Sequence, residues 1–376
     1  MSLEWHDALH PLRAMMTGLV RSPHRWPVSR RLLVAVGASV LAGAGRPAAA
    51  LAQSARPALA QYLRSVGIDD KQRADAARGR AVAKLLPTKD SRDVTVLGVI
   101  GVNVPRDTVV TRALDVGSFL AARGRRFHVF AHPPSPADVR DVMFDESEYR
   151  GLRNCRKGDC DFKLSASAMT DFVERVDWSA RDAKAQADER LRAEMLRLVT
   201  EYASRGNAGM PTYDDGMGVQ SAASFDALVA QTSDLYAVAP ELQRYLSTYP
   251  AQRPDGARDV LYWAEERLPR LRPTLTLNHL VVYAAPGRGT GAAFVARKQI
   301  YASHYFEAAL ELLAIVDGDG ATGEPRTYLL TMRRFRFDAL PGGLFNIRGR
   351  VRRQLVDATR ADLERQRAAV QQTATP

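Results

Sequence analysis

The stretch from residue 274 to residue 337 alternates strand-like runs with turns, and this pattern constrains the fold more than any other feature of the chain. Each run is rich in apolar and β-branched residues, and the breaks between runs carry glycine with aspartate or proline. The runs span 274–284, 292–303, 305–316 and 326–337, with the clearest turns at 286–289 and 317–320. Consecutive strands joined by short turns predict an antiparallel meander.

One earlier strand and one later helix frame this meander. Residues 93–104 are apolar and β-rich and end at Pro105, after which 106–124 has the spacing of a short helix. At the other end, a long helical pattern follows Gly342-Gly343 and continues to a polar tail at 371–376, which we expect to be disordered.

Helical patterns dominate the rest of the chain. The pattern ending at Pro87 and those at 166–206 and 221–268 carry apolar residues three and four apart. We therefore predict an α+β protein organised as a leader (1–53), an N-terminal helical segment (54–90) and one domain (91–370) that contains a helical insertion (165–270).

Two segments resemble the helix-grip superfamily of START-like and polyketide-cyclase-like proteins. Residues 99–109, a strand leading into a small helix, are similar to the first strand of that family, and residues 336–343 resemble its approach to the closing helix. The terminal part is also similar to exported bacterial proteins without an assigned role. The helix-grip resemblance implies an antiparallel sheet curved around the long C-terminal helix, with an apolar cavity between them that holds a lipid-like molecule.

If that resemblance holds, polar or amphipathic residues within the apolar strands are the candidates for ligand contact, because such sites orient a ligand with a few polar groups. They are His279, Tyr301, His304, Tyr305 and Arg336. In strands, residues of these types are more often ordinary core or rim residues.

The sequence contains no specific catalytic motif, and it predicts neither a cofactor nor a metal site. The favoured hypothesis is a protein that binds an apolar small molecule or lipid. The alternatives are a structural or partner-binding protein without a ligand, and a cyclase- or hydrolase-like enzyme that uses His279 or His304 as a base.

The leader has the three parts of a signal peptide. An apolar run at 32–45 is shorter than the ~20 residues that span a bilayer, basic residues precede it, and Ala50-Leu51-Ala52 offers a cleavage site. Arg30-Arg31 is similar to the start of a twin-arginine export signal. We expect a periplasmic or secreted protein, with a buried N-terminal helix as the alternative.

The net charge of +11 comes partly from this leader. Residues 1–53 hold six arginines against Glu4 and Asp7, a balance of +4 that leaves +7 for the remainder. That excess is spread along the chain, so we expect no nucleic-acid partner. One denser basic group can either face an anionic membrane or be a solvated face: Arg333, Arg334, Arg336, Arg348, Arg350, Arg352 and Arg353.

The only two cysteines, Cys155 and Cys160, enclose a turn sequence. In an exported protein an isolated pair is most simply a disulfide, here closing a hairpin. Four residues lie between the two cysteines, whereas a C-x-x-C redox motif has two. A zinc site would need further ligands such as His128 and His132. We predict the disulfide, with a metal site and a redox switch as alternatives.

Overall fold

The architecture is taken from a computed structural model. It describes residues 59–123, 125–216, 218–232, 239–267, 271–284, 292–338 and 347–372, with the side chains of 347 and 348 excepted. The predicted signal peptide, the turn predicted at 286–289 and Gly342-Gly343 lie outside these residues. The described residues belong to one compact unit, assigned to 46–376.

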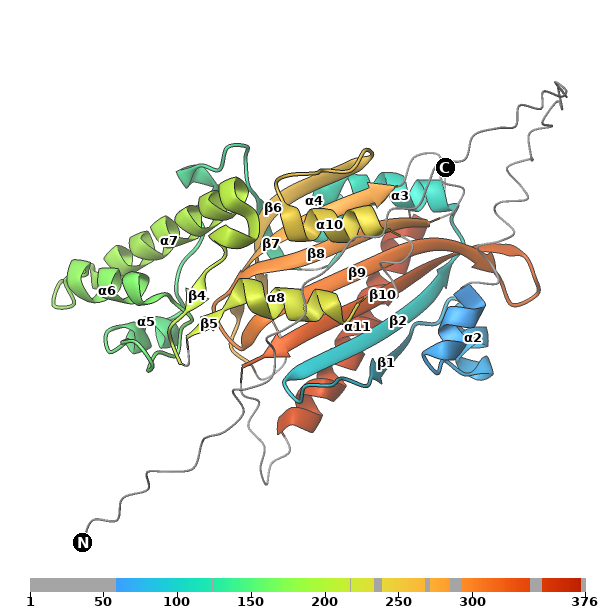
Figure 1. Cartoon of the computed structure of the whole chain (residues 1–376), viewed down its shortest axis with the longest axis horizontal. Coiled ribbons are helices and arrows are strands. Elements are labelled where there is room, and N and C mark those ends of the chain that lie inside the picture. The colour runs from blue at the N-terminus through green and yellow to red at the C-terminus, as the bar shows by residue number, and fades with distance from the viewer. Residues whose placement is uncertain are drawn as a thin grey trace, which may run out of the picture. The chain divides into compact units, whose positions relative to one another are not determined.

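The described residues form a large antiparallel sheet, as the sequence predicts (Figure 1). Its strands lie in the order β1-β2-β10-β9-β8-β7-β6-β3. Their bounds are β1 Val82–Leu86, β2 Asp93–Val102, β3 Arg126–Val129, β6 Ala257–Glu266, β7 Thr274–Ala284, β8 Ala292–Ala302, β9 Phe306–Asp319 and β10 Pro325–Phe337. The predicted strand at 93–104 and all four runs of the meander are therefore confirmed. The early strand β2 pairs with the late strand β10, so the sheet joins the two ends of the predicted domain.

Helices cover one sheet face, which we call the inner face. They are α3 (Arg106–Leu114), α4 (Val116–Ala121) and the C-terminal helix α11 (Ile347–Gln372). Figure 1 shows α11 behind the sheet, where it contacts β1 and β2. Strand residues two apart share a face, so Leu313 and Ile315 both point to this side and pack with Leu363 of α11.

The opposite, outer face is also covered. Here α8 (Ser221–Ala230) and α10 (Pro240–Thr248) pack on the central strands, and α2 (Asp70–Ala77) packs near β1 and β2 (Figure 1). Phe225 of α8 and Leu242 of α10 are fully buried against strand residues such as Leu312. Coverage of both faces explains why β2 is buried along its whole length.

The chain between β3 and β6 forms the helical insertion. Its elements are η1 (Pro136–Val139), α5 (Glu146–Leu152), α6 (Ala166–Arg175), α7 (Ala183–Arg205), η2 (Gly206–Gly209), β4 (Thr212–Tyr213), β5 (Val219–Gln220), α8 and α10. Cys155 and Cys160 are joined by a disulfide, and an antiparallel bridge between Arg156 and Asp159 forms the turn that they enclose. The predicted disulfide is thus present in the structure.

Two helical predictions are wrong. Residues 82–86 form β1 rather than the end of a helix, because the chain turns at Gly79, whose φ is +78°, and then pairs with β2. Residues 257–266 form β6, held between β3 and β7, so the helical part of the insertion ends before Ala257. Pairing with neighbours distant in sequence decides both cases.

Smaller differences concern element ends. The predicted helix at 166–206 is two helices, α6 and α7. Strand β9 begins at Phe306 rather than Tyr305 and continues through the predicted turn at 317–320 as far as Asp319. Gln371 and Gln372 belong to α11, and the rest of the predicted tail lies outside the described residues.

Gly98 of β2 sets how closely α11 approaches the sheet. A Cβ atom at this position would lie 2.8 Å from both Leu363 Cδ1 and Thr359 Cγ2. Gly98→Val should therefore destabilise the protein by about 1–3 kcal/mol through overpacking. Gly151→Val is the control, because nothing lies within 4 Å of the added Cβ, and it should change stability by less than about 0.5 kcal/mol. Urea unfolding measures both, and equal stabilities would contradict the close approach.

Candidate functional site

The side chains on the inner face change from apolar to charged along the strands. On β9 the inward residues run from the apolar Leu313 and Ile315 to the charged Glu311. On β10 they run from Leu329 to Arg333. The layer between the sheet and α11 therefore has an apolar end and a charged middle.

The apolar end contains a cavity of about 250 Å³. We call it the apolar cavity; α3, α4, α11, β9 and β10 line it, and it opens to solvent beside Asp115 and Ser118. Its walls are made largely by Val109, Ala113, Phe119, Ala122, Leu313, Ile315, Leu329, Ala369 and Val370. Three of these residues are alanines, Ala113 on α3, Ala122 directly after α4 and Ala369 on α11, and their short side chains leave the space that larger residues would fill.

Polar groups at this cavity already have partners. Arg112 donates to the main-chain carbonyls of Ala369, at 3.3 Å, and of Val370. Gln366 donates from Nε2 to Asp362 at 3.0 Å. Because these groups are bonded within the protein, the cavity surface favours an apolar occupant over a polar one.

A buried ionic network closes the inner end of the apolar cavity. Arg123 Nη2 donates to Glu311 Oε1 at 2.6 Å and to Asp362 Oδ2 at 3.0 Å. Arg333 bonds to the same two carboxylates. Glu311 comes from β9, Arg333 from β10 and Asp362 from α11, and Arg123 follows α4. The network therefore ties the sheet to α11 and to the end of α4.

The carboxylates of this network are ionised. Burial by itself would raise the pKa of Glu311, but Arg123 and Arg333 hold that pKa well below its ordinary value. Burial likewise opposes ionisation of Asp362, and the same two guanidinium groups lower its pKa. The charges are therefore mutually dependent inside the protein.

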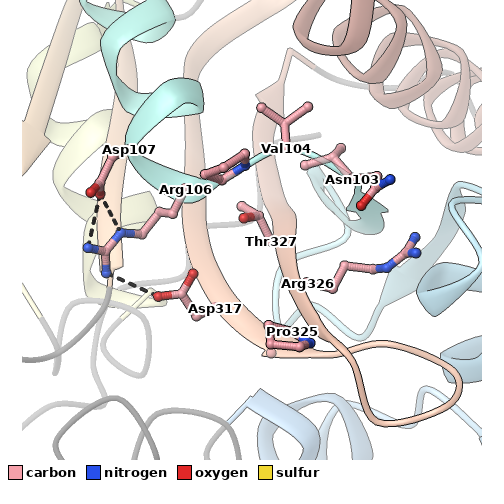
Figure 2. Close-up of a pocket in the computed structure, with 11 residues that line it drawn as sticks. Asn103, Val104, Arg106, Asp107, Asp317, Pro325, Arg326 and Thr327 are labelled. Carbon is pink, nitrogen blue, oxygen red and sulfur yellow. Dashed lines mark hydrogen bonds and ion pairs between the residues drawn. The ribbon is translucent and has the colours of Figure 1, made fainter. Parts of the chain in front are cut away.

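A second, polar pocket of about 380 Å³ lies at the ends of β9 and β10 (Figure 2). Arg106 at the start of α3 pairs with Asp107 at 3.1 Å and with Asp317 at 3.3 Å. Figure 2 shows Arg326 on the other side of Thr327, with its side chain extending toward Asn103.

The polar pocket continues from the apolar cavity along the same strands. Asp317 follows Ile315 by two residues on β9, and Thr327 precedes Leu329 by two on β10. Residues two apart lie on one face and about 6.6 Å apart. The two spaces are thus neighbours on the inner face, one apolar and one polar.

None of the five predicted ligand residues lines the apolar cavity. His279 is buried on the outer face, where Tyr202 Oη lies 2.9 Å from its Nδ1 and Asp259 Oδ2 lies 3.3 Å from its Nε2. Arg336 also lies on the outer face and pairs with Asp93 at 2.8 Å.

The other three predicted residues contact the helical insertion or the segment before β7. Tyr301 donates to the carbonyl of Lys163 at 2.9 Å. The His304 ring lies 2.8 Å from Glu148 Oε1 through its Nε2, and Tyr305 Oη accepts from the main-chain nitrogen of Arg272 at 3.0 Å. The structure therefore separates the five residues into three places and gives each a partner within the protein.

The outer face carries one unusual cation beside His279. Lys298 of β8 is fully buried, and its ammonium donates to Leu246 O at 3.1 Å and to Asn207. It also lies 4.4 Å from the centre of the Phe225 ring. Burial lowers the pKa of Lys298 to about 7. Burial also lowers the pKa of His279, although Asp259 opposes that shift.

This lysine predicts a pH dependence of stability. The pKa of Lys298 is about 7 in the folded protein and 10.5 for an ordinary lysine, so between these values the unfolded chain binds more protons. Stability should rise with pH over this window, by at most about 1.4 kcal/mol per pH unit. Lys298→Met should remove that slope. Urea unfolding from pH 7 to pH 9.5 measures it, and identical slopes for both proteins would show that the lysine is charged in the fold.

The cavity residues were not identified from the sequence. Ala113, Phe119 and Ala369 have the helical spacing of ordinary core residues, and nothing in that spacing marks an unfilled layer. Small side chains at neighbouring turns of α3, α4 and α11 indicate a cavity only once the three helices are known to converge.

Comparisons with known proteins, and the residue types at the site, place few constraints on the function. No protein-family model matches the chain, and no curated protein matches it. Within the described residues, no three His, Cys, Asp or Glu side chains come together as a metal site. None of the helices described has the length and apolar character needed to cross a membrane.

Proposed function

We propose that this protein is exported and binds an apolar or lipid-like small molecule between the sheet and α11. The observation that carries the proposal is the apolar cavity of about 250 Å³ in that layer. Its apolar walls, and the prior engagement of Arg112 and Gln366, favour a hydrocarbon group there.

The neighbouring polar pocket extends this proposal to an amphiphile. Asp317 and Thr327 lie on the inner face, two residues beyond Ile315 and Leu329 of the apolar cavity. A ligand with its chain in the apolar cavity would bring a polar end, such as a hydroxyl group, to these side chains.

The order of elements supports the helix-grip relation as part of the same proposal. A first strand, β2, leads into the short helices α3 and α4, antiparallel strands follow, and the long helix α11 closes the domain. The apolar cavity lies between the sheet and α11, where the resemblance places a ligand. The insertion between β3 and β6 adds helices mainly on the other side.

Filling the apolar cavity tests the binding proposal. Ala369 lines the cavity, whereas its neighbour Ala368 is exposed on α11, so the same substitution can be compared at both positions. Ala369→Phe should weaken binding of the fluorescent apolar probe 1-anilinonaphthalene-8-sulfonate by roughly tenfold or more, and Ala368→Phe by less than about twofold. Thermal unfolding confirms that both variants are folded. Equal affinities would place the probe elsewhere and contradict the proposal.

Export is tested on the full chain produced in a bacterium with a periplasm. Recognition of the signal peptide predicts a mature N-terminus within a few residues of Gln53. Thiol labelling of the native protein should modify Cys155 and Cys160 only after reduction, because they form a disulfide. Intact Met1 on protein confined to the cytoplasm would contradict export.

A further inference from the structure

A third cavity lies on the inner face, on the far side of the ionic network from the apolar cavity. Its volume is about 40 Å³, and it lies between the sheet and the Leu355–Ala358 turn of α11. A single water needs about 10–15 Å³ by the same measure. The space therefore admits a small ion or a few water molecules but no lipid.

Buried donors without partners line this cavity. They are the Nε atoms of Arg297 and Arg333 and the Nε2 atom of Gln299, none of which makes a hydrogen bond among the described residues. All three residues are at most 5% exposed. Arg297 Nε lies 3.3 Å from Glu311 Oε2 as an ion pair, without hydrogen-bond geometry. Buried donors cost free energy unless an acceptor reaches them.

The surrounding charges are not balanced. The cavity and the ionic network together hold four guanidinium groups and three carboxylates, which leaves one positive charge in excess. The residues are Arg123, Arg125, Arg297 and Arg333 against Glu266, Glu311 and Asp362. Arg365, 3.2 Å from Asp362, adds positive charge at the edge.

All three carboxylates are ionised, so this count holds at neutral pH. Burial would raise the pKa of Glu266, but Arg125 and Arg297 keep it below its ordinary value, as described above for the other two carboxylates. Glu266 also lines the cavity, but its carboxylate already pairs with Arg125 at 2.8 Å and with Arg297 at 3.0 Å. Buried charge without a counter-charge is costly.

We propose that this cavity is a binding site for a small monovalent anion of the size of chloride or formate. The anion accepts hydrogen bonds from Gln299 and Arg333 and supplies the missing negative charge. The site is separate from the proposed apolar ligand, because the network of Arg123, Glu311 and Asp362 lies between the two cavities. Its effect is to hold the sheet and α11 together in the charged half of their interface.

Thermal unfolding in different sodium salts tests this site. Chloride, compared with gluconate at equal ionic strength, should raise the midpoint in a saturable manner, by roughly 2–5 °C at ten times the dissociation constant. Gluconate is too large for the cavity. Gln299→Leu removes one donor at nearly constant size and should abolish most of the difference between the two salts.

Gln354→Leu is the matched control, because Gln354 is on α11 but does not line the cavity, and it should retain the full chloride effect. Crystals soaked in bromide locate the ion directly by anomalous scattering, with a peak expected within hydrogen-bond distance of Gln299 Nε2. Equal midpoints in the two salts, or a cavity that holds only water at high bromide concentration, would overturn the proposal.

Discussion

The buried network of Arg123, Arg333, Glu311 and Asp362 is the interaction on which the layer between the sheet and α11 depends. Each charge in it is stabilised mainly by the opposite charges around it, because all four side chains are withdrawn from water. Loss of one member would leave a buried charge unpaired, which typically costs 3–5 kcal/mol, although such a network is weak evidence for net stability. Its role here is to position α11 against β9 and β10.

The same constraint explains why cavities remain in an otherwise packed interior. At Gly98, where β2 has no side chain, Leu363 and Thr359 of α11 come into direct contact with the strand. Beyond the network, the residues that face the sheet include three alanines, from α3, from the residue after α4 and from α11. Interiors normally leave few voids larger than a water molecule. An apolar space of about 250 Å³ beside a fixed helix is therefore a feature that a ligand would use.

Much of the sheet could be predicted from the sequence, because β7 to β10 are long and follow one another through short turns. Strands β1 and β6 could not, since Val82–Leu86 and Ala257–Glu266 carry helix-compatible residues and become strands through pairing with distant partners. For the site, alternation told which strand residues share a face but not which face meets α11. His279 and Arg336 were chosen for their chemistry, and both lie on the outer face. The cavity itself arises where three helices converge, and no local pattern encodes that.

The position of the arginines changes the interpretation of the basic composition. Arg333 and Arg334 of the dense basic group are buried, and Arg336 pairs with Asp90 and Asp93. These charges are engaged inside the protein, whereas Arg350 and Arg353 of α11 are exposed. Long-range attraction scales with charge that solvent and partners can reach. Part of the positive charge of this chain is therefore a property of its interior and not of its surface.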